Sequence, residues 1–145
     1  MKKTISFNRL FLDTCVLIYF LEGHEIYGPY AKSILERVES GRLTADISVL
    51  TLTELLTGPY RLNDDHLALE YHALLYYFPN LKIRDINLDI AAEAARIRGT
   101  YDLATPDSLL LATALYTGAD AFITNDKRLM KFPELGVFNL EYENL

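Results

Sequence analysis

The sequence predicts an α/β domain with a mainly parallel sheet, and three observations support this prediction. Short apolar runs of strand length alternate with longer segments in which apolar residues recur at helical spacing. Strands joined by helices form parallel sheets that are covered on both faces, which agrees with the apolar character of the runs. The chain carries no repeat, low-complexity stretch or linker, so we expect residues 1–145 to form a single domain.

The apolar pattern and the residues that begin or end helices predict the order of the elements. Gly23, Gly99 and Gly118 each follow a helical pattern, and glycine is favoured just past a helix end. The cluster Asn63-Asp64-Asp65 is typical of a helix start, and the following helix should end before Pro79. The expected order is strand 9–12, helix 15–22, helix 29–41, strand 43–48, a helix from about 52 to Gly58-Pro59, a helix from 63–65 to before Pro79, strand 82–86, helix 88–97, helix 107–116, strand 121–124, short helix 126–131 and strand 137–142.

The composition is typical of a globular protein, with half of the residues hydrophobic and 23% charged. The 20 acidic and 14 basic side chains give a formal net charge of −6, which by itself argues against a basic nucleic-acid-binding surface. No segment has the pattern of a signal peptide or a membrane span, and the single Cys15 cannot form an internal disulfide. We therefore expect a cytoplasmic protein that acts away from membranes.

Four acidic residues occupy positions that a parallel sheet would bring to one edge. Asp13 ends the first predicted strand, and Asp126 follows the fourth. Glu54 is expected in the first turn of the helix after the second strand, and Asp107 in the first turn of the helix that leads into the fourth. Because strand ends and helix starts meet at the carboxyl edge of such a sheet, where ligands bind, we expect all four side chains to lie there.

Each acid taken alone also has a structural interpretation. Thr51 to Glu54 fits a capping box, in which the acid bonds back to the helix start. Thr105-Pro106-Asp107 fits a helix start, with Thr105 as the cap, a proline at the first helical position and an acid in the first turn. Asn125-Asp126 is equally suited to cap a turn, and Asp13 to close a strand. Their predicted convergence on one edge favours a functional cluster, because caps occur anywhere on a protein.

A cluster of partly buried carboxylates indicates a bound cation. The acids repel one another and destabilise the fold unless a positive charge neutralises them. Carboxylate oxygens suit Mg²⁺ or Mn²⁺, and the sequence has none of the His and Cys clusters that are typical of zinc sites. Such a site is suited to phosphoryl substrates.

The segments that contain the four acids resemble the signature motifs of PIN-domain nucleases. These segments are Leu12-Asp13-Thr14, Ser48-Val49-Leu50-Thr51-Leu52-Thr53-Glu54, Thr105-Pro106-Asp107-Ser108 and Ile123-Thr124-Asn125-Asp126. The resemblance extends from about Arg9 to Tyr142. The short chain is similar to the VapC toxins of bacterial and archaeal toxin–antitoxin pairs.

The resemblance implies a three-layer α/β/α sandwich with a five-stranded sheet in the order 3-2-1-4-5. It also implies an endoribonuclease that uses Mg²⁺ or Mn²⁺ to hydrolyse RNA phosphodiester bonds, forms a homodimer and is silenced by a cognate antitoxin protein. By position, the family's catalytic and metal-binding acids match Asp13, Glu54, Asp107 and Asp126. Thr14 and Thr124 match small polar neighbours whose hydroxyls can assist the site.

Two other functions fit parts of the pattern. Phosphatases similar to the haloacid dehalogenases also have an aspartate after the first strand, but their Asp-x-Asp pattern needs an acid where Cys15 lies. The second alternative is a catalytically silent PIN-like module that serves only for binding or as a scaffold. Intact acids at all four positions argue against it.

Overall fold

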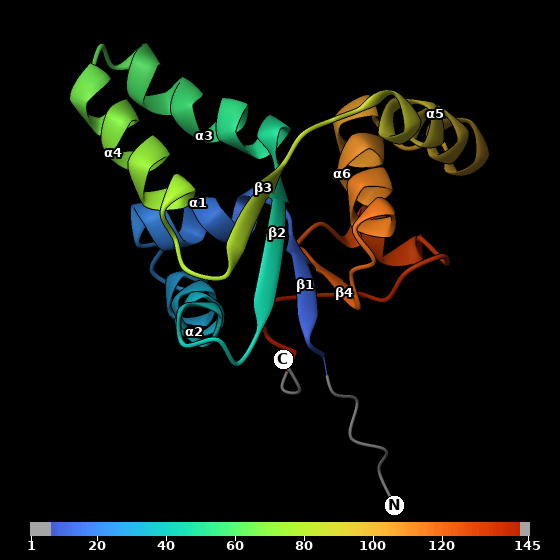
Figure 1. The fold of residues 1–145 in the computed structure, drawn as a ribbon, viewed down its shortest axis with the longest axis horizontal. Helices are drawn as coiled ribbons and strands as arrows, with labels where there is room; N and C mark the ends of the chain where they lie inside the picture. Colours follow the sequence, from blue (N-terminus) through green and yellow to red (C-terminus); the bar gives the residue numbers. More distant parts are fainter. Residues whose placement is uncertain (1–6, 143–145) are drawn as a thin grey trace, which may run out of the picture.

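The computed structural model describes residues 7–142, in which five strands form one parallel sheet (Figure 1). The strands are β1 (Arg9–Leu12), β2 (Thr44–Ser48), β3 (Leu81–Arg84), β4 (Ala121–Ile123) and β5 (Val137–Phe138). Their order is β3-β2-β1-β4-β5, and each neighbouring pair is parallel. The predicted α/β class and the strand order implied by the family resemblance are both confirmed.

Helices cover both faces of the sheet and make a three-layer sandwich (Figure 1). The helices are α1 (Thr14–Glu22), α2 (Gly28–Glu39), α3 (Val49–Arg61), α4 (Asp65–Tyr76), α5 (Leu88–Tyr101), α6 (Thr105–Tyr116) and the short 3-10 helix η1 (Lys127–Lys131). Helices α5 and α6 pack together on one side, while α1 and α2 pack on the other. Helices α3 and α4 form a pair that extends beyond the carboxyl end of β2.

The alternation of side chains along β1 divides the hydrophobic core in two. Leu10 and Leu12 point into the cluster formed with α1 and α2, whereas Phe11 points into the cluster formed with α5 and α6. All three are fully buried, as expected for a central parallel strand. The ring of Phe11 stacks on that of Phe122 in β4, with 5.6 Å between ring centroids. This packing fixes β1 against β4, whose ends carry two of the four predicted site acids.

Helix α3 begins earlier than predicted. The Ser48 hydroxyl accepts a hydrogen bond from the Leu50 N–H (3.1 Å), so the helix begins at Val49 rather than near residue 52. The interpretation of Thr51 to Glu54 as a capping box is therefore wrong. The expected position of Glu54 is wrong as well, because it lies in the second turn of α3 and not in the first.

Several elements, α3 among them, end at different residues than predicted. Helix α3 continues past Pro59, which lies in its last turn, so the missing backbone donor interrupts the helical bonding only near the end of the helix. Helix α5 continues through Gly99 because Asp102 adopts the left-handed conformation at its end (φ 53°). The strand expected at 137–142 stops at its second residue, since residues 139–142 form a turn. Within residues 7–142, no helix has the length and apolar character that a membrane span requires.

Candidate active site

Asp13 lies where β1 ends and α1 begins, and its carboxylate is held from two sides. The Oδ1 atom accepts a hydrogen bond from the Thr14 N–H (2.8 Å), and Oδ2 accepts one from the Thr124 hydroxyl (2.6 Å). The Thr124 hydroxyl also accepts a hydrogen bond from the Asp126 N–H (3.0 Å). Thr124 therefore connects the ends of two neighbouring strands, β1 and β4, and brings Asp13 and Asp126 together.

Glu54 reaches the same region from α3. The Thr51 hydroxyl in the first turn of α3 is hydrogen-bonded to the Thr14 hydroxyl (2.8 Å), which joins the start of α3 to the start of α1. Glu54 lies three residues after Thr51 and therefore on the same side of the helix. Its side chain lines a cleft of about 350 Å³. The cleft is lined by Asp13, Thr14, Cys15, Ile18, Tyr19, Glu54, Asn125 and Asp126.

Asp107 faces this group from α6. The helix begins at Thr105 and Ala104 occupies the cap position without a side-chain hydrogen bond, so the interpretation of Thr105 as a cap is wrong. Asp107 lies in the first turn, as predicted. Asp107 lines a second pocket of about 300 Å³ together with Arg128, which contacts Asp126 in the wall of the first cleft. The structure thus places three of the predicted acids in one cleft and the fourth, Asp107, beside it.

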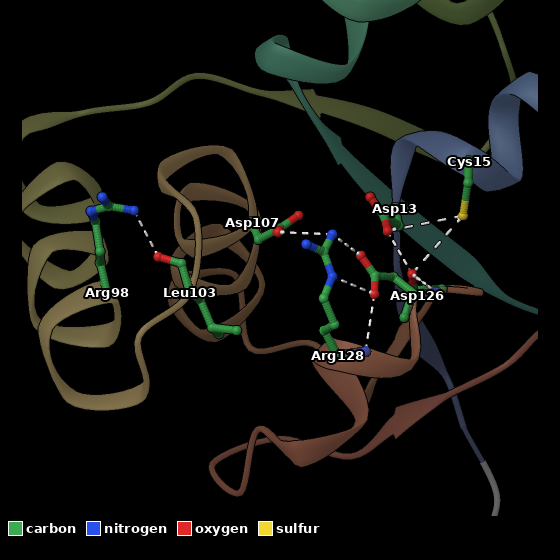
Figure 2. Close-up of polar contacts among 8 residues, drawn as sticks. Asp13, Cys15, Arg98, Leu103, Asp107, Asp126 and Arg128 are labelled. Atoms are coloured by element: carbon green, nitrogen blue, oxygen red, sulfur yellow. Dashed lines mark hydrogen bonds and ion pairs between the residues drawn. The ribbon is translucent and has the colours of Figure 1, made fainter.

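Arg128 lies between Asp107 and Asp126 (Figure 2). Its Nη2 atom is 2.7 Å from Asp126 Oδ2, and its Nε atom donates to Asp126 Oδ1 (3.1 Å). The same Nη2 atom is 4.0 Å from Asp107 Oδ2. Asp126 Oδ1 also accepts the Arg128 N–H (2.9 Å), so the interpretation of Asp126 as a cap, here of η1, is correct alongside its place in the acidic group.

The acids alter one another's protonation. Burial raises the pKa of Asp13 above its ordinary value, and the charges of Asp107 and Asp126 raise it further. Burial is also the largest cause of the raised pKa of Glu54, followed by the charges of Asp13 and Asp107. The pKa of Asp107 is raised by burial and by Asp126, with Arg128 opposing. Hydrogen bonds from Arg128 lower the pKa of Asp126. Three of the four acids are therefore less stable as carboxylates here than in water, as is expected of carboxylates that bind a cation.

Asp46, a second buried acid of the sheet, lies outside the acidic group and provides a comparison for Asp13. Asp46 in β2 is 2% exposed and pairs with Arg84 (3.0 Å) and Arg9 (3.7 Å). Asp13 is 9% exposed, yet no basic side chain of residues 7–142 forms a hydrogen bond or ion pair with it. Its hydrogen-bond partners are the Thr124 hydroxyl, the Thr14 N–H and the Cys15 thiol, and the charged groups near it are other acids. The difference marks Asp13 as the centre of the acidic group.

The donor set is limited to oxygen. Within residues 7–142, no group of three or more His, Cys, Asp or Glu side chains forms a ready metal-binding arrangement in this conformation, in which Arg128 contacts two of the acids. Cys15 lies in the wall of the cleft, 3.9 Å from Asp13 Oδ2, and burial together with the Asp13 charge raises the pKa of its thiol to about 11. It therefore remains a thiol near neutral pH and is not a nucleophile.

Two residues at the site have little signal in the sequence. Thr51 has the spacing of a capping residue, and only the tertiary structure shows its hydroxyl bonded to α1. Arg128 follows Asp126 by two residues, but nothing in that spacing indicates that its side chain turns back toward Asp107. Both act across elements that are far apart in the sequence, where periodicity carries no information.

Comparison with known proteins identifies relatives over nearly the whole described chain. The family model for the PIN domain matches residues 10–135. A comparison with curated protein sequences gives no match.

Several solved structures are similar in fold. The chain is similar to a toxin–antitoxin complex from Klebsiella pneumoniae, with 26% identity, a TM-score of 0.71, and coverage of 90% of this chain and 97% of that chain. It is also similar to VapBC2 from Rickettsia felis bound to a promoter DNA fragment (19% identity, TM-score 0.73, 90% and 98% covered). A third similar structure is VapBC-1 from nontypeable Haemophilus influenzae (21% identity, TM-score 0.70, 91% and 98% covered).

Proposed function

Since the chain belongs to the PIN-domain family, we propose that it is an endoribonuclease that hydrolyses RNA phosphodiester bonds with Mg²⁺ or Mn²⁺. The observation that carries the proposal is the buried Asp13 carboxylate, which is surrounded by three other acids and contacts no basic side chain of residues 7–142. Such a group is stabilised by a divalent cation. Oxygen ligands are those that Mg²⁺ and Mn²⁺ prefer.

The proposed site residues are Asp13, Glu54, Asp107 and Asp126, with Thr14 and Thr124 in support. Asp13 and Asp107 would hold the ion, and Glu54 and Asp126 would orient the water around it. An ion bound here would make a water molecule a better nucleophile near neutral pH and would offset charge on the phosphoryl oxygens.

The threonines would keep the acids in place. Thr124 holds one oxygen of Asp13 and the backbone N–H of Asp126, so it sets the separation of these two acids. Thr14 is bonded to Thr51, and this bond sets the position of Glu54 relative to Asp13. With their backbone positions fixed in this way, the acids would need to move side chains rather than backbone to bind an ion.

We also propose that the chain is the toxin of a toxin–antitoxin pair and binds an antitoxin protein. The similar structure from Klebsiella pneumoniae is described as a toxin–antitoxin complex, and the structures from Rickettsia felis and Haemophilus influenzae are VapBC proteins, which supports this proposal. RNA as substrate rests on the family resemblance. A single domain over residues 1–145, a homodimer and a cytoplasmic location are part of the same proposal.

The test is an RNA cleavage assay with purified protein in Mg²⁺, in Mn²⁺ and in EDTA. We expect cleavage with either ion, none in EDTA, and none with Asp13→Asn in any buffer. Asp120→Asn is the matched control, because Asp120 lies at the opposite end of the sheet, where its carboxylate accepts the N–H groups of Asn8 and Arg9. Cleavage that persists in EDTA, or with Asp13→Asn, would refute the proposed function.

A further inference from the structure

Arg128 is the one basic side chain among residues 7–142 that forms ion pairs with the acids of the proposed site. Its guanidinium bonds to both carboxylate oxygens of Asp126 and lies 4.0 Å from Asp107 (Figure 2). It therefore places a positive charge where the acids need one. A guanidinium and a divalent ion attracted to the same carboxylates repel each other, so they compete for this position.

The Arg128 side chain is not fixed by burial. It is 74% exposed, whereas the side chains of Asp107 and Asp126 are 21% and 27% exposed. Exposed ion pairs contribute little to stability, so an arginine in this setting is readily displaced. The backbone of Asp107 is held by α6 and that of Asp126 by the start of η1, where Asp126 also accepts the Arg128 N–H.

A pocket next to the acids offers the displaced side chain a second position. This pocket, of about 300 Å³, is lined by Tyr101, Asp102, Leu103, Ala104, Asp107, Arg128 and Lys131. Arg128 and Lys131 lie one helical turn apart on η1 and both line it. The Arg98 guanidinium lies beside the pocket, where it donates to the Leu103 carbonyl (2.9 Å). The pocket thus brings two cations, Arg128 and Lys131, together with the carboxylates of Asp102 and Asp107, and the two basic side chains suit a phosphate that is attached to the substrate.

We propose that Arg128 alternates between two partners. Without a divalent ion it neutralises Asp126 and Asp107. With the ion bound, its guanidinium turns into the adjoining pocket and, together with Lys131, binds an RNA phosphate next to the one that is cleaved. The inference rests on the proposed function for its substrate, because a polynucleotide carries a further phosphate next to the one that is cleaved. The competition with the ion does not depend on the substrate.

Ion binding without RNA tests the first part of the inference, the competition between Arg128 and the ion. Titration with Mn²⁺, followed by the electron paramagnetic resonance of the free ion, is compared between the unaltered protein, Arg128→Ala and the control Lys127→Ala. Lys127 lies in η1 beside Arg128, but it lines neither pocket. We expect Arg128→Ala to bind Mn²⁺ more tightly, by up to about fivefold, because the ion no longer breaks an exposed ion pair. The affinity of Lys127→Ala should stay unchanged.

RNA binding tests the second part of the inference, the contact of Arg128 and Lys131 with an RNA phosphate. Anisotropy of a short fluorescent single-stranded RNA is measured at several salt concentrations in the Glu54→Gln background, so that the probe is not cleaved. With Mn²⁺, Arg128→Ala and Lys131→Ala should each reduce the slope of log affinity against log salt by about 0.7, the value for one lost phosphate contact. In EDTA, Arg128→Ala should leave the slope unchanged, since its guanidinium then contacts Asp126. Lys127→Ala should have no effect in either buffer.

The outcomes separate this inference from the proposed function. Equal Mn²⁺ affinity in Arg128→Ala and the unaltered protein overturns the inference even if RNA is cleaved normally. An Arg128→Ala effect on RNA binding that is the same in EDTA and in Mn²⁺ also overturns it. A third outcome is that Arg128→Ala binds Mn²⁺ more tightly than the unaltered protein, but the unaltered protein cleaves no RNA. This outcome refutes the proposed function and the phosphate contact, and it supports the competition between Arg128 and the ion.

Discussion

At the scale of single residues, Thr124 has the most connected position in the site. It is fully buried, its hydroxyl donates to Asp13 Oδ2 (2.6 Å), and it accepts the Asp126 N–H (3.0 Å). One hydroxyl therefore uses both of its capacities on the two acids that follow neighbouring strands. A side chain of the same shape without a hydroxyl would leave a carboxylate and a backbone N–H without this partner.

We predict that Thr124→Val lowers the RNA cleavage rate by about 10- to 100-fold, the usual effect of losing a residue that orients a metal ligand. It should also lower the free energy of unfolding by about 1–3 kcal/mol, because two polar groups lose their hydrogen-bond partner. Cleavage kinetics and urea unfolding measure the two effects. Thr124→Ser keeps the hydroxyl and should restore most of the rate. A Thr124→Val protein with normal cleavage would show that the hydroxyl does not position the acids.

At the scale of helices and strands, the sequence predicted the existence of each element better than its ends. The sequence predicts a cap at Thr51, yet Ser48, at the end of the preceding strand, is also of a residue type that caps helices. The structure uses Ser48 as the cap and leaves Thr51 to bond with Thr14 in another helix. Local spacing cannot distinguish these two uses, because the second depends on a tertiary contact.

Gly99 illustrates the same point at a helix end. A glycine after a helical pattern predicts a left-handed end, yet Gly99 continues α5, and Asp102 takes the left-handed conformation instead. Aspartate tolerates this conformation better than most residues do. Gly23 and Gly118, by contrast, have positive φ angles of 63° and 71°, as their positions predict.

This difference predicts opposite effects of alanine at two glycines. Gly99 has ordinary helical geometry, and a Cβ built there meets no atom within 4 Å. Gly99→Ala should therefore raise the free energy of unfolding by about 0.5–1 kcal/mol. Gly118→Ala is the control, since φ is 71° there, and it should destabilise by about 1 kcal/mol or more. Thermal unfolding of the two variants and of the unaltered protein measures both effects. A Gly99→Ala protein that is less stable than the unaltered protein would contradict the helical geometry at Gly99.

At the scale of the whole molecule, the sheet topology explains why so much of the site was predictable. Asp13 and Asp126 follow strands, and the parallel order β1-β4 makes those strand ends neighbours. The sequence alone therefore placed these acids at one edge. The sequence did not predict that Asp107 lies outside the cleft, with Arg128 between it and Asp126. That arrangement depends on how α6 and η1 pack. Positions along strands are set by alternation, whereas side-chain partners between elements are set by packing.

The acidic group couples the stability of the whole fold to pH. The pKa values of Asp13, Glu54 and Asp107 are raised, chiefly by burial. A raised pKa in the folded state favours folding when the group is protonated. This contribution is complete below the ordinary pKa, and it is lost as pH rises through the raised value. Asp126 acts in the opposite direction, because Arg128 lowers its pKa, so its contribution is present above the ordinary value and is lost as pH falls.

We therefore predict that Asp13→Asn changes how stability depends on pH. In EDTA, the unaltered protein should lose the Asp13 contribution as pH rises through the raised pKa of that group, whereas Asp13→Asn should not. The free energy of unfolding of the variant, relative to the unaltered protein, should thus increase with pH. Urea unfolding at a series of pH values measures this difference. The Asp120→Asn variant should follow the unaltered protein, since Asp120 lies at the other end of the sheet.

A divalent ion should reverse the loss, because it stabilises only the folded state with charged acids. At a hundred times its dissociation constant, Mn²⁺ should raise the free energy of unfolding by about 2.7 kcal/mol. The gain should be larger at neutral pH than at acid pH, where the raised pKa values keep Asp13, Glu54 and Asp107 protonated. Asp13→Asn should lose most of the gain at every pH. Equal stabilisation of both proteins by Mn²⁺ would mean that the ion binds elsewhere.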